Sequence, residues 1–279
     1  MTYTVPCAAR VNIRRLQSNV KLRFIFIRFK IETPVCQMCG RFTLKAPAPE
    51  LVAALGLTEF PQFSPRYNIA PTQLVFCIRV SEDHPAKRGA SMLRWGLIPS
   101  WAKNTEANVP LFNARSETAA EKPAFRNAFR FQRCLIPADG FFEWKTLQKK
   151  HSKQPWYIRQ PDEGVFCFAG LWETWQDPSG ASIESCTVLT TQANKDIAEL
   201  HKRMPVVLPA SSYGTWLSNA SSPGQLQDLM CPLPSGSLVR YAVSSVVNKA
   251  TNDSPECIQP VEPEANATRP LNRQRRLFD

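Results

Sequence analysis

The sequence predicts an α+β fold built around a mostly antiparallel, barrel-like sheet with short peripheral helices. Strand-like runs of aliphatic and aromatic residues outnumber helical patterns, and the two do not alternate regularly as they would in a doubly wound fold. The 24 prolines against 11 glycines indicate many ordered turns and few long helices. With 43% hydrophobic residues among 279, the chain has enough apolar side chains for a sizeable core.

The expected elements begin with a short amphipathic helix over Pro49–Leu57. Strand-like runs follow along most of the chain, at Leu74–Val80, Met92–Trp95, Arg133–Pro137, Phe141–Lys145, Trp156–Arg159, Val165–Thr174, Cys186–Thr191, Pro205–Leu208 and Leu238–Val243. Further helices are expected in the second half, near Lys195–His201, Ser211–Leu217 and Gln225–Met230. No internal repeat is visible.

Composition divides the chain into a core and two unlike ends. Residues 1–37 are rich in Arg, contain Glu32 as their only acid, and are expected to be an N-terminal extension that is absent from the active form. Within them, Lys21–Ile31 is too short and too charged to span a membrane. Residues 38–261 form the predicted domain, and residues 262–279 a basic tail that we expect to be disordered.

The net charge of +11 suggests a polyanionic partner, but part of it belongs to the extension. Residues 1–37 hold seven Lys or Arg and one acid, a net charge of +6, so the remaining chain carries +5. That value fits a nucleic-acid groove and an ordinary soluble protein equally well. Charge alone therefore does not decide the function.

The cysteines indicate a reducing compartment. Their number is odd, and several lie inside apolar runs, which is typical of cysteines packed as small hydrophobic residues. Cys36 and Cys39 match the Cys-x-x-Cys spacing, but no second pair, nearby histidine or βαβ pattern accompanies them, so a zinc or thioredoxin-like site is disfavoured. The nine are Cys7, Cys36, Cys39, Cys77, Cys134, Cys167, Cys186, Cys231 and Cys257.

Cys39 is the most informative of these residues, because it follows Met38, which is either a start residue or a cleavage point. A chain that begins at Cys39 carries an amine and a thiol on adjacent carbons. Such an aminothiol traps an aldehyde: the amine forms a Schiff base, and the thiol then closes a five-membered thiazolidine. The reference pKa of an α-amine is ~7.7–8.0 against ~10.4 for lysine, so far more of it is neutral and nucleophilic. A buried structural cysteine is the alternative.

Two other residues are suited to proton transfer. Glu143 lies among aromatic residues in Phe141–Lys145, and an apolar environment would raise the pKa of its carboxyl group. Its alternatives are a solvent-facing position or an ion pair with Lys145. His201 is one of three histidines, and a histidine is able to shuttle protons near neutral pH, although a lone histidine also commonly forms hydrogen bonds at the end of a helix.

Several segments fit two interpretations, a nucleic-acid-binding site and a purely structural role such as a turn, a core position or a helix cap. The segment Arg66–Pro71 forms either a wall of a binding site or a turn. Trp95 and Trp101 are able to stack on bases, but we expect at least one of them in the core. In Asn113–Thr118, Arg115 suits a phosphate, while Ser116 resembles a helix N-cap.

Taken together, these motifs resemble the SOS-response-associated peptidase (SRAP) family, also called abasic-site processing proteins. The resemblance covers roughly Met38 to Val261. The matching stretches, in chain order, are MCGRF, RYNIAP, RWGLIPSWA, FNARSET, CLIPADGFFEWK, QPWYI, FAGLWETW, TVLTTQAN, HKRMPVVL and IQPV.

The resemblance implies a sensor of abasic sites in single-stranded DNA, whose ring-opened sugar exposes the aldehyde that an aminothiol traps. Cys39 would be the nucleophile, and Asn113 would hydrogen-bond near the reacting sugar. Glu143 would act as acid and base, and His201 would assist ring opening or the reverse step. The residues expected to hold the strand are Arg41, Arg115, Trp144, Thr190 and Arg203. No metal or organic cofactor is needed.

Two alternatives remain beside this covalent, lyase-type chemistry. The family's link to peptidase activity suggests a thiol-dependent autoprocessing protease, with Met38 and Cys39 at the cleavage point. A non-covalent single-strand binder, in which Cys39 is structural, is the other. We expect a monomer that makes no membrane contact and acts in the DNA damage response. It would lie in the cytoplasm beside the nucleoid of a bacterium, or in the nucleus of a eukaryote.

The basic tail suggests one further partner. Gln274, Leu277 and Phe278 fit the Gln-x-x-Leu-Phe pattern of short peptides that bind the bacterial sliding clamp. The alternative is that the arginines of the tail contact DNA nonspecifically.

Overall fold

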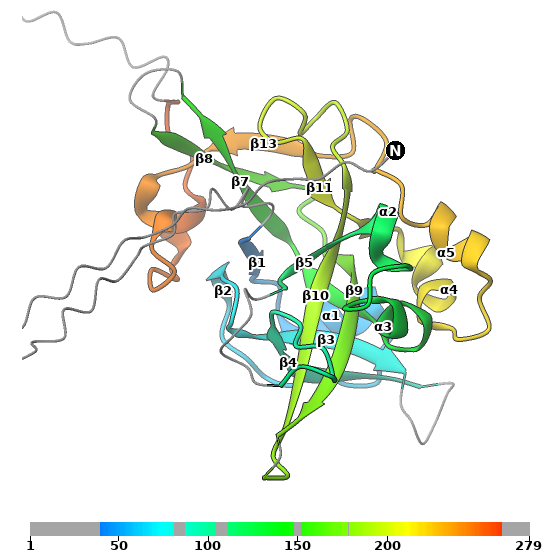
Figure 1. The fold of residues 1–279 in the computed structure, drawn as a ribbon. Helices are drawn as coiled ribbons and strands as arrows, with labels where there is room; N and C mark the ends of the chain where they lie inside the picture. The colour runs from blue at the N-terminus through cyan, green and yellow to red at the C-terminus, as the bar shows by residue number, and fades with distance from the viewer. Residues whose placement is uncertain (1–39, 81–86, 104–110, 148–151, 178, 264–279) are drawn as a thin grey trace, which may run out of the picture. The chain divides into compact units, whose positions relative to one another are not determined.

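The computed structural model describes residues 40–80, 87–103, 111–147, 152–177 and 179–263 (Figure 1). The strands are β1 (Phe42–Leu44), β2 (Arg66–Ile69), β3 (Leu74–Val80), β4 (Arg88–Trp95), β5 (Asn113–Arg115), β6 (Arg133–Ala138), β7 (Gly140–Thr146), β8 (Lys153–Arg159), β9 (Phe166–Gln176), β10 (Ser182–Gln192), β11 (Arg203–Pro205), β12 (Val207–Leu208) and β13 (Val239–Ala242). The helices are α1 (Ala48–Leu55), α2 (Ser116–Ala119), α3 (Arg126–Phe131), α4 (Tyr213–Leu217) and α5 (Pro223–Asp228), with 3-10 turns η1 (Ala210–Ser212), η2 (Ser245–Asn248) and η3 (Pro255–Ile258).

The strands form two sheets. One has the order β13-β8-β7-β1-β2, and all of its pairings are antiparallel. In the other, β10-β4-β3-β6-β9 closes into a barrel because β9 pairs again with β10, while β11, β12 and β5 extend it. Only β10 has parallel neighbours, β4 and β5, among the described strands. The prediction of a mostly antiparallel, barrel-like α+β fold is confirmed.

A continuous apolar core fills the space between the strands. In it, the ring of Phe42 meets those of Trp95 and Phe168 edge to face, at centroid distances of 5.1 and 5.7 Å. Gly170 lets strands β9 and β6 approach closely, because a Cβ there would lie 2.8 Å from the sulfur of Cys134. Helices α3, α4 and α5 lie together on one side of the barrel (Figure 1).

Most predicted elements are present, with two differences. The expected strand Pro205–Leu208 is interrupted at Val206, which separates β11 from β12. The expected helix Lys195–His201 is a run of turns, although the Asn194 side chain accepts the Asp196 backbone N–H at 3.1 Å as a helix N-cap would.

The cysteines follow the prediction where the structure describes them. Cys231 is exposed, and the other described cysteines are buried and free of disulfides: Cys77, Cys134, Cys167, Cys186 and Cys257. In the described part of the chain, no helix has both the length and the hydropathy that crossing a membrane requires. The predicted extension and almost all of the predicted tail lie outside the described residues.

Candidate functional site

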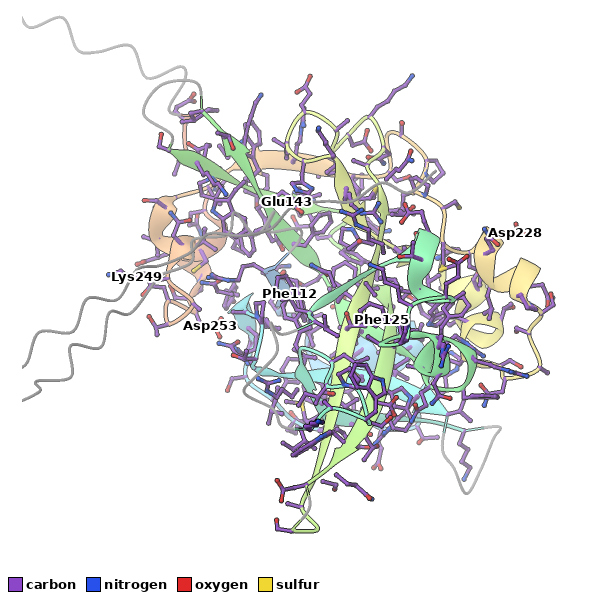
Figure 2. All side chains as sticks on the ribbon, in the orientation of Figure 1. Phe112, Phe125, Glu143, Asp228, Lys249 and Asp253 are labelled. Atoms are coloured by element: carbon purple, nitrogen blue, oxygen red, sulfur yellow. The ribbon has the colours of Figure 1, made fainter. Side chains whose placement is uncertain are left out.

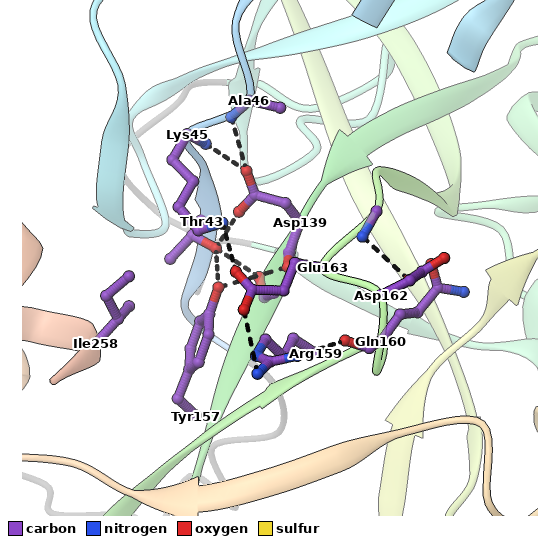
Figure 3. Close-up of polar contacts among 12 residues, drawn as sticks. Thr43, Lys45, Ala46, Asp139, Tyr157, Arg159, Gln160, Asp162, Glu163 and Ile258 are labelled. Atoms are coloured by element: carbon purple, nitrogen blue, oxygen red, sulfur yellow. Dashed lines mark hydrogen bonds and ion pairs between the residues drawn. The ribbon is translucent and has the colours of Figure 1, made fainter. Parts of the chain in front are cut away.

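A buried carboxylate holds the first described strand in place. Asp139 has no exposed surface, and its Oδ2 accepts the backbone N–H groups of Lys45 and Ala46 at 2.5 and 2.9 Å (Figure 3). Its Oδ1 accepts the hydroxyl of Thr43 at 2.5 Å. Three donors from one short stretch of chain therefore converge on one carboxylate, and such charge-assisted bonds are stronger than neutral ones. They fix β1 against β7.

Gly140 is required by the same contact. A Cβ at this position would overlap the hydroxyl of Tyr157, whose oxygen lies 2.9 Å from Thr43 Oγ1. Burial, with Asp139 nearby, raises the pKa of Tyr157, so its hydroxyl keeps its proton. The Asp139-Gly140 pair is therefore a packing feature where β6 passes into β7.

The register of β1 against β7 brings the start of the described chain to Glu143. Phe42 pairs with Phe141, and the backbone N–H of Phe142 donates to the carbonyl of Arg41 at 3.0 Å. Continuing this antiparallel register places Gly40 opposite Glu143. Glu143 is only 1% exposed and lies in the middle of β7 (Figure 2). The alternative that Glu143 faces solvent is therefore wrong.

Arg41 and Trp144 are both oriented by η2. Arg41 Nη1 donates to Asn68 Oδ1 at 2.8 Å and to the Val247 carbonyl at 2.7 Å, and Nη2 donates to the Asn248 carbonyl at 3.2 Å. The indole N–H of Trp144 donates to Asn248 Oδ1 at 2.8 Å. The Arg41 guanidinium lies 6.0 Å from the centre of the Trp144 ring. Arg41 thus holds the protein's own backbone with donors that a phosphate would otherwise use.

Asn68 ties β2 to the coil that contains η2. Its side chain is buried, and its amide N–H groups donate to three backbone carbonyls of this coil at 2.7 to 3.1 Å, those of Val247, Lys249 and Asn252. Asp253 accepts the Asn68 backbone N–H at 2.9 Å. Because Asn68 also accepts from Arg41, the segment Arg66–Pro71 supports the site by positioning that arginine.

Strand β5 presents two of the predicted residues beside β10. Asn113 pairs with Val188 and Arg115 with Thr190 in a parallel register. Asn113 is half-buried and Arg115 is exposed. The hydroxyl of Thr190 donates to the carbonyl of Ala114 at 3.4 Å. The exposed position of Arg115 leaves its guanidinium open to solvent, which suits a phosphate contact.

The expectation that Ser116 caps a helix is wrong. Helix α2 begins at Ser116 itself, with Arg115 in the cap position and no side-chain cap bond. Ser116 is therefore the first residue of the helix, and its hydroxyl makes no cap bond.

His201 is oriented by the backbone of Arg203. Its Nδ1 accepts the Arg203 N–H at 3.1 Å and lies 3.2 Å from the Arg203 carbonyl oxygen. When Nδ1 accepts, the neutral ring carries its proton on Nε2. The alternative of a hydrogen-bonding histidine at a helix end is thus half right: the ring does bond to the backbone, but the preceding residues are turns and not a helix.

Arg203 is held by two residues. Its Nε donates to Thr190 Oγ1 at 3.3 Å, and its Nη2 also donates to the Thr190 carbonyl. Both terminal nitrogens of the guanidinium donate to the Glu117 carboxylate, each at 2.8 Å. Arg203, predicted to hold phosphate, is thus already paired with a carboxylate of the protein.

The two tryptophans have different environments. Trp95 is buried, and its indole N–H donates to the Phe112 carbonyl at 2.8 Å. Trp101 is 64% exposed. The expectation that at least one of them lies in the core is confirmed, and Trp101 keeps an exposed ring.

The predicted site residues fall into two groups by the strands that carry them. The first group lies on β7 and directly before β1, and consists of Arg41, Glu143 and Trp144. The second lies on or beside β5, β10 and β11, and consists of Asn113, Arg115, Thr190, His201 and Arg203. Met38 and Cys39 lie outside the described residues.

Two residues that support the site were not predicted from the sequence. The pattern around Asp139 could have indicated it, because it is an acid inside the apolar run from β6 to β7. No local pattern indicates Asn248, since it acts by accepting the indole N–H of Trp144, more than 100 residues earlier in the chain. Within the described ranges, no three His, Cys, Asp or Glu side chains stand together as metal ligands would.

Comparisons with known proteins agree with the sequence resemblance. The family model described as SOS response associated peptidase (SRAP) matches residues 38–250. The chain is 39% identical over 226 residues to the abasic site processing protein YoqW of Bacillus subtilis, covering 80% of this chain and 99% of that protein. It is 28% identical over 275 residues to the abasic site processing protein HMCES of Pongo abelii, covering 81% and 77%.

Solved structures share the fold. The crystal structure of a Bacteroides thetaiotaomicron protein superposes with a TM-score of 0.70 at 26% identity, covering 80% of this chain and all of that one. A Bordetella bronchiseptica protein superposes with a TM-score of 0.62 at 30% identity, covering 74% of this chain and all of its own. With its sequence relatives and its barrel in agreement, the chain belongs to the SOS response associated peptidase (SRAP) family.

Proposed function

We propose that this protein senses abasic sites in single-stranded DNA and traps them as a thiazolidine through the α-amine and thiol of Cys39. Its relatives are named abasic site processing proteins, and the family match begins at residue 38, directly before Cys39. The acting form is then the chain that starts at Cys39.

The observation that carries this proposal is the register of β1 against β7. It places Gly40 opposite the buried Glu143, and Cys39 is joined to Gly40 by one peptide bond. Consecutive Cα atoms are ~3.8 Å apart, so position 39 is one residue away from the position that this register pairs with Glu143. The hydrogen bonds that Asp139 accepts from β1 and the residues after it anchor the strand that makes this pairing.

The chemistry needs no oxidant or reductant. The neutral amine of Cys39 adds to the C1′ aldehyde of the opened sugar, and loss of one water gives the Schiff base. The thiol sulfur then adds to the same carbon while its proton passes to nitrogen, which closes the ring. In this scheme Glu143 receives and returns these protons, and Asn113 hydrogen-bonds near the sugar. As the sugar ring opens, a protonated His201, whose Nδ1 lies 3.2 Å from the Arg203 carbonyl oxygen, gives its Nε2 proton to the ring oxygen and becomes a neutral imidazole, while the hydroxyl on C1′ loses its proton to solvent.

The strand itself is held by side chains of both groups. Arg115 offers an exposed fork to a phosphate, and Trp144 offers a half-buried ring for stacking. Arg41 and Thr190 support these contacts mainly by positioning, because their described bonds run to the protein. Arg203 also faces the strand in this scheme, with its fork bonded to Glu117 before DNA binds.

A denaturing gel tests the proposal. Protein that begins at Cys39, verified by mass, is mixed with a single-stranded oligonucleotide that contains one abasic site. The expected result is a heat-stable shifted band that is absent with a tetrahydrofuran analogue, which has no C1′ aldehyde. Cys39→Ala should lose this band and retain at most a Schiff base that borohydride traps. A shift seen only on native gels would instead identify a non-covalent binder.

The second candidate is autoproteolysis, which the peptidase in the family's description favours. Cleavage after Met38 would expose the aminothiol, so both activities would be consecutive steps of one protein. Incubating purified full-length chain and following its intact mass tests this: conversion to a chain starting at Cys39, lost in Cys39→Ala, supports it. A full-length mass that stays constant would leave removal to another protease.

A further inference from the structure

Glu117 and Arg203 form a forked ion pair beside the second group of site residues. Both carboxylate oxygens of Glu117 accept from the guanidinium of Arg203, each at 2.8 Å. The Arg203 side chain is 14% exposed and that of Glu117 is 44% exposed. The arginine is therefore fixed within the protein, while its carboxylate partner stands at the surface.

The pair uses the donors that a phosphate would need. A guanidinium has five N–H groups, and a carboxylate and a phosphate bind the same fork of two parallel donors. In Arg203, two of these groups donate to Glu117, and Thr190 accepts two more through its hydroxyl and its carbonyl. A phosphate therefore gains the fork of Arg203 only when the carboxylate of Glu117 leaves it.

Glu117 is charged and has room to move. The hydrogen bonds from Arg203 hold the pKa of Glu117 below its usual range, so it is an anion at neutral pH. It also lines an open hollow of about 410 Å³, together with Ser116, Thr191 and Asp228. A carboxylate at such an edge is able to swing away from Arg203 without disturbing the core.

We propose that Glu117 is an internal competitor of the DNA phosphate for Arg203 and thereby weakens the binding of undamaged single-stranded DNA. This inference rests on the proposed function. A strand that takes the Arg203 fork must displace Glu117 and leave a second anion beside its own phosphates. Intact strands are then released more readily. The preference for abasic over undamaged single-stranded DNA therefore depends on the covalent step.

Fluorescence anisotropy with an intact single-stranded oligonucleotide tests this on protein that begins at Cys39, the form proposed to act. Glu117→Gln should bind roughly threefold to fivefold more tightly than wild type, as expected for a partly exposed charge pair. Its plot of log affinity against log salt should steepen by about 0.7, the value for one additional phosphate contact on a single strand. Glu121→Gln is the matched control, because it removes one exposed acid from the same segment.

A double variant separates competition for Arg203 from any other effect of Glu117. In an Arg203→Ala background no fork remains to compete for, so adding Glu117→Gln should change affinity by less than about twofold. The same tightening in this background as in wild type would show that Glu117 does not act through Arg203.

Other outcomes also overturn the inference. Weaker binding by Glu117→Gln would mean that the carboxylate positions Arg203 for DNA, and unchanged binding would mean that Glu117 does not compete with the strand. An equal gain in DNA affinity by Glu121→Gln would show that the effect comes from the change in net charge and not from the position of Glu117. If wild type still crosslinks abasic DNA in these cases, only the role of Glu117 fails. If wild type neither binds nor crosslinks single-stranded DNA, the proposed function fails as well.

Discussion

Glu143 is buried in the middle of β7, where the register of β1 brings Gly40 opposite it. Replacing it with Gln keeps the shape and removes proton transfer. We expect Glu143→Gln to slow crosslinking by roughly 10²- to 10⁴-fold, the usual range for a general acid or base. Affinity for intact single-stranded DNA should stay within about twofold. Single-turnover gels and anisotropy measure the two quantities, and a variant that loses affinity but crosslinks at the normal rate would exclude this role.

Arg115 is the exposed arginine of β5 and is well placed to contact a phosphate. We expect Arg115→Ala to weaken binding to intact single-stranded DNA and to reduce the salt slope by about 0.7, since one phosphate contact is lost. Arg126→Ala is the control, because it removes an exposed arginine of α3 instead. Equal losses in both variants would indicate a general effect of charge.

Single residues differ in how far the sequence predicts them. The apolar neighbours of Glu143 suggested a buried carboxylate but left a solvent-facing one open, and the structure buries it. The pairing of Glu117 with Arg203 joins residues 86 positions apart, so no local pattern indicates it. The same holds for Asn248, which accepts from both Arg41 and Trp144 although it lies far from them in the chain.

At the scale of elements, the site depends on how firmly β1 is held against β7. Asp139 accepts three hydrogen bonds from β1 and the residues after it. Asp139→Ala would leave buried donors without an acceptor, at about 1–3 kcal/mol for each donor that water does not reach. We expect a loss of roughly 2–4 kcal/mol in the free energy of unfolding, measured by urea denaturation.

The control for this prediction is Asp162→Ala. Asp162 lies in an exposed turn and accepts one backbone N–H, that of Gly164, at 3.1 Å. Its loss should change the free energy of unfolding by less than about 1 kcal/mol. Similar losses in the two variants would show that Asp139 does not anchor β1.

The long strands were predictable, and the three-residue strands β1 and β5 were not. The strands over Leu74–Val80 and Val165–Thr174 follow from their apolar runs, and the first matches β3 in both bounds. The strands β1 and β5 have three residues each, too few for a periodic pattern, and they are defined by their partners β7 and β10. Because β1 directly follows Arg41 and β5 begins at Asn113, the site was less predictable than the barrel.

At the scale of the whole molecule, the tail is expected to bind a partner protein, the bacterial sliding clamp. Its residues Gln274, Leu277 and Phe278 lie outside the described ranges, so the clamp interaction stays a prediction. A fluorescent peptide of residues 269–279 should bind a purified bacterial sliding clamp with micromolar affinity, through an apolar pocket that takes Leu277 and Phe278. The peptide with both of these residues changed to Ala is the control. Equal binding of the two would make the tail a nonspecific basic arm.

The central claim is that Cys39 reacts through a free α-amine. The most direct measurement is the intact mass of the crosslinked product, followed by mapping of the modified peptide. We predict a mass equal to the chain from Cys39 onward plus the oligonucleotide minus one water, with the modification on Cys39. A stable adduct on protein that retains residues 1–38, or an adduct at another residue, would contradict this claim.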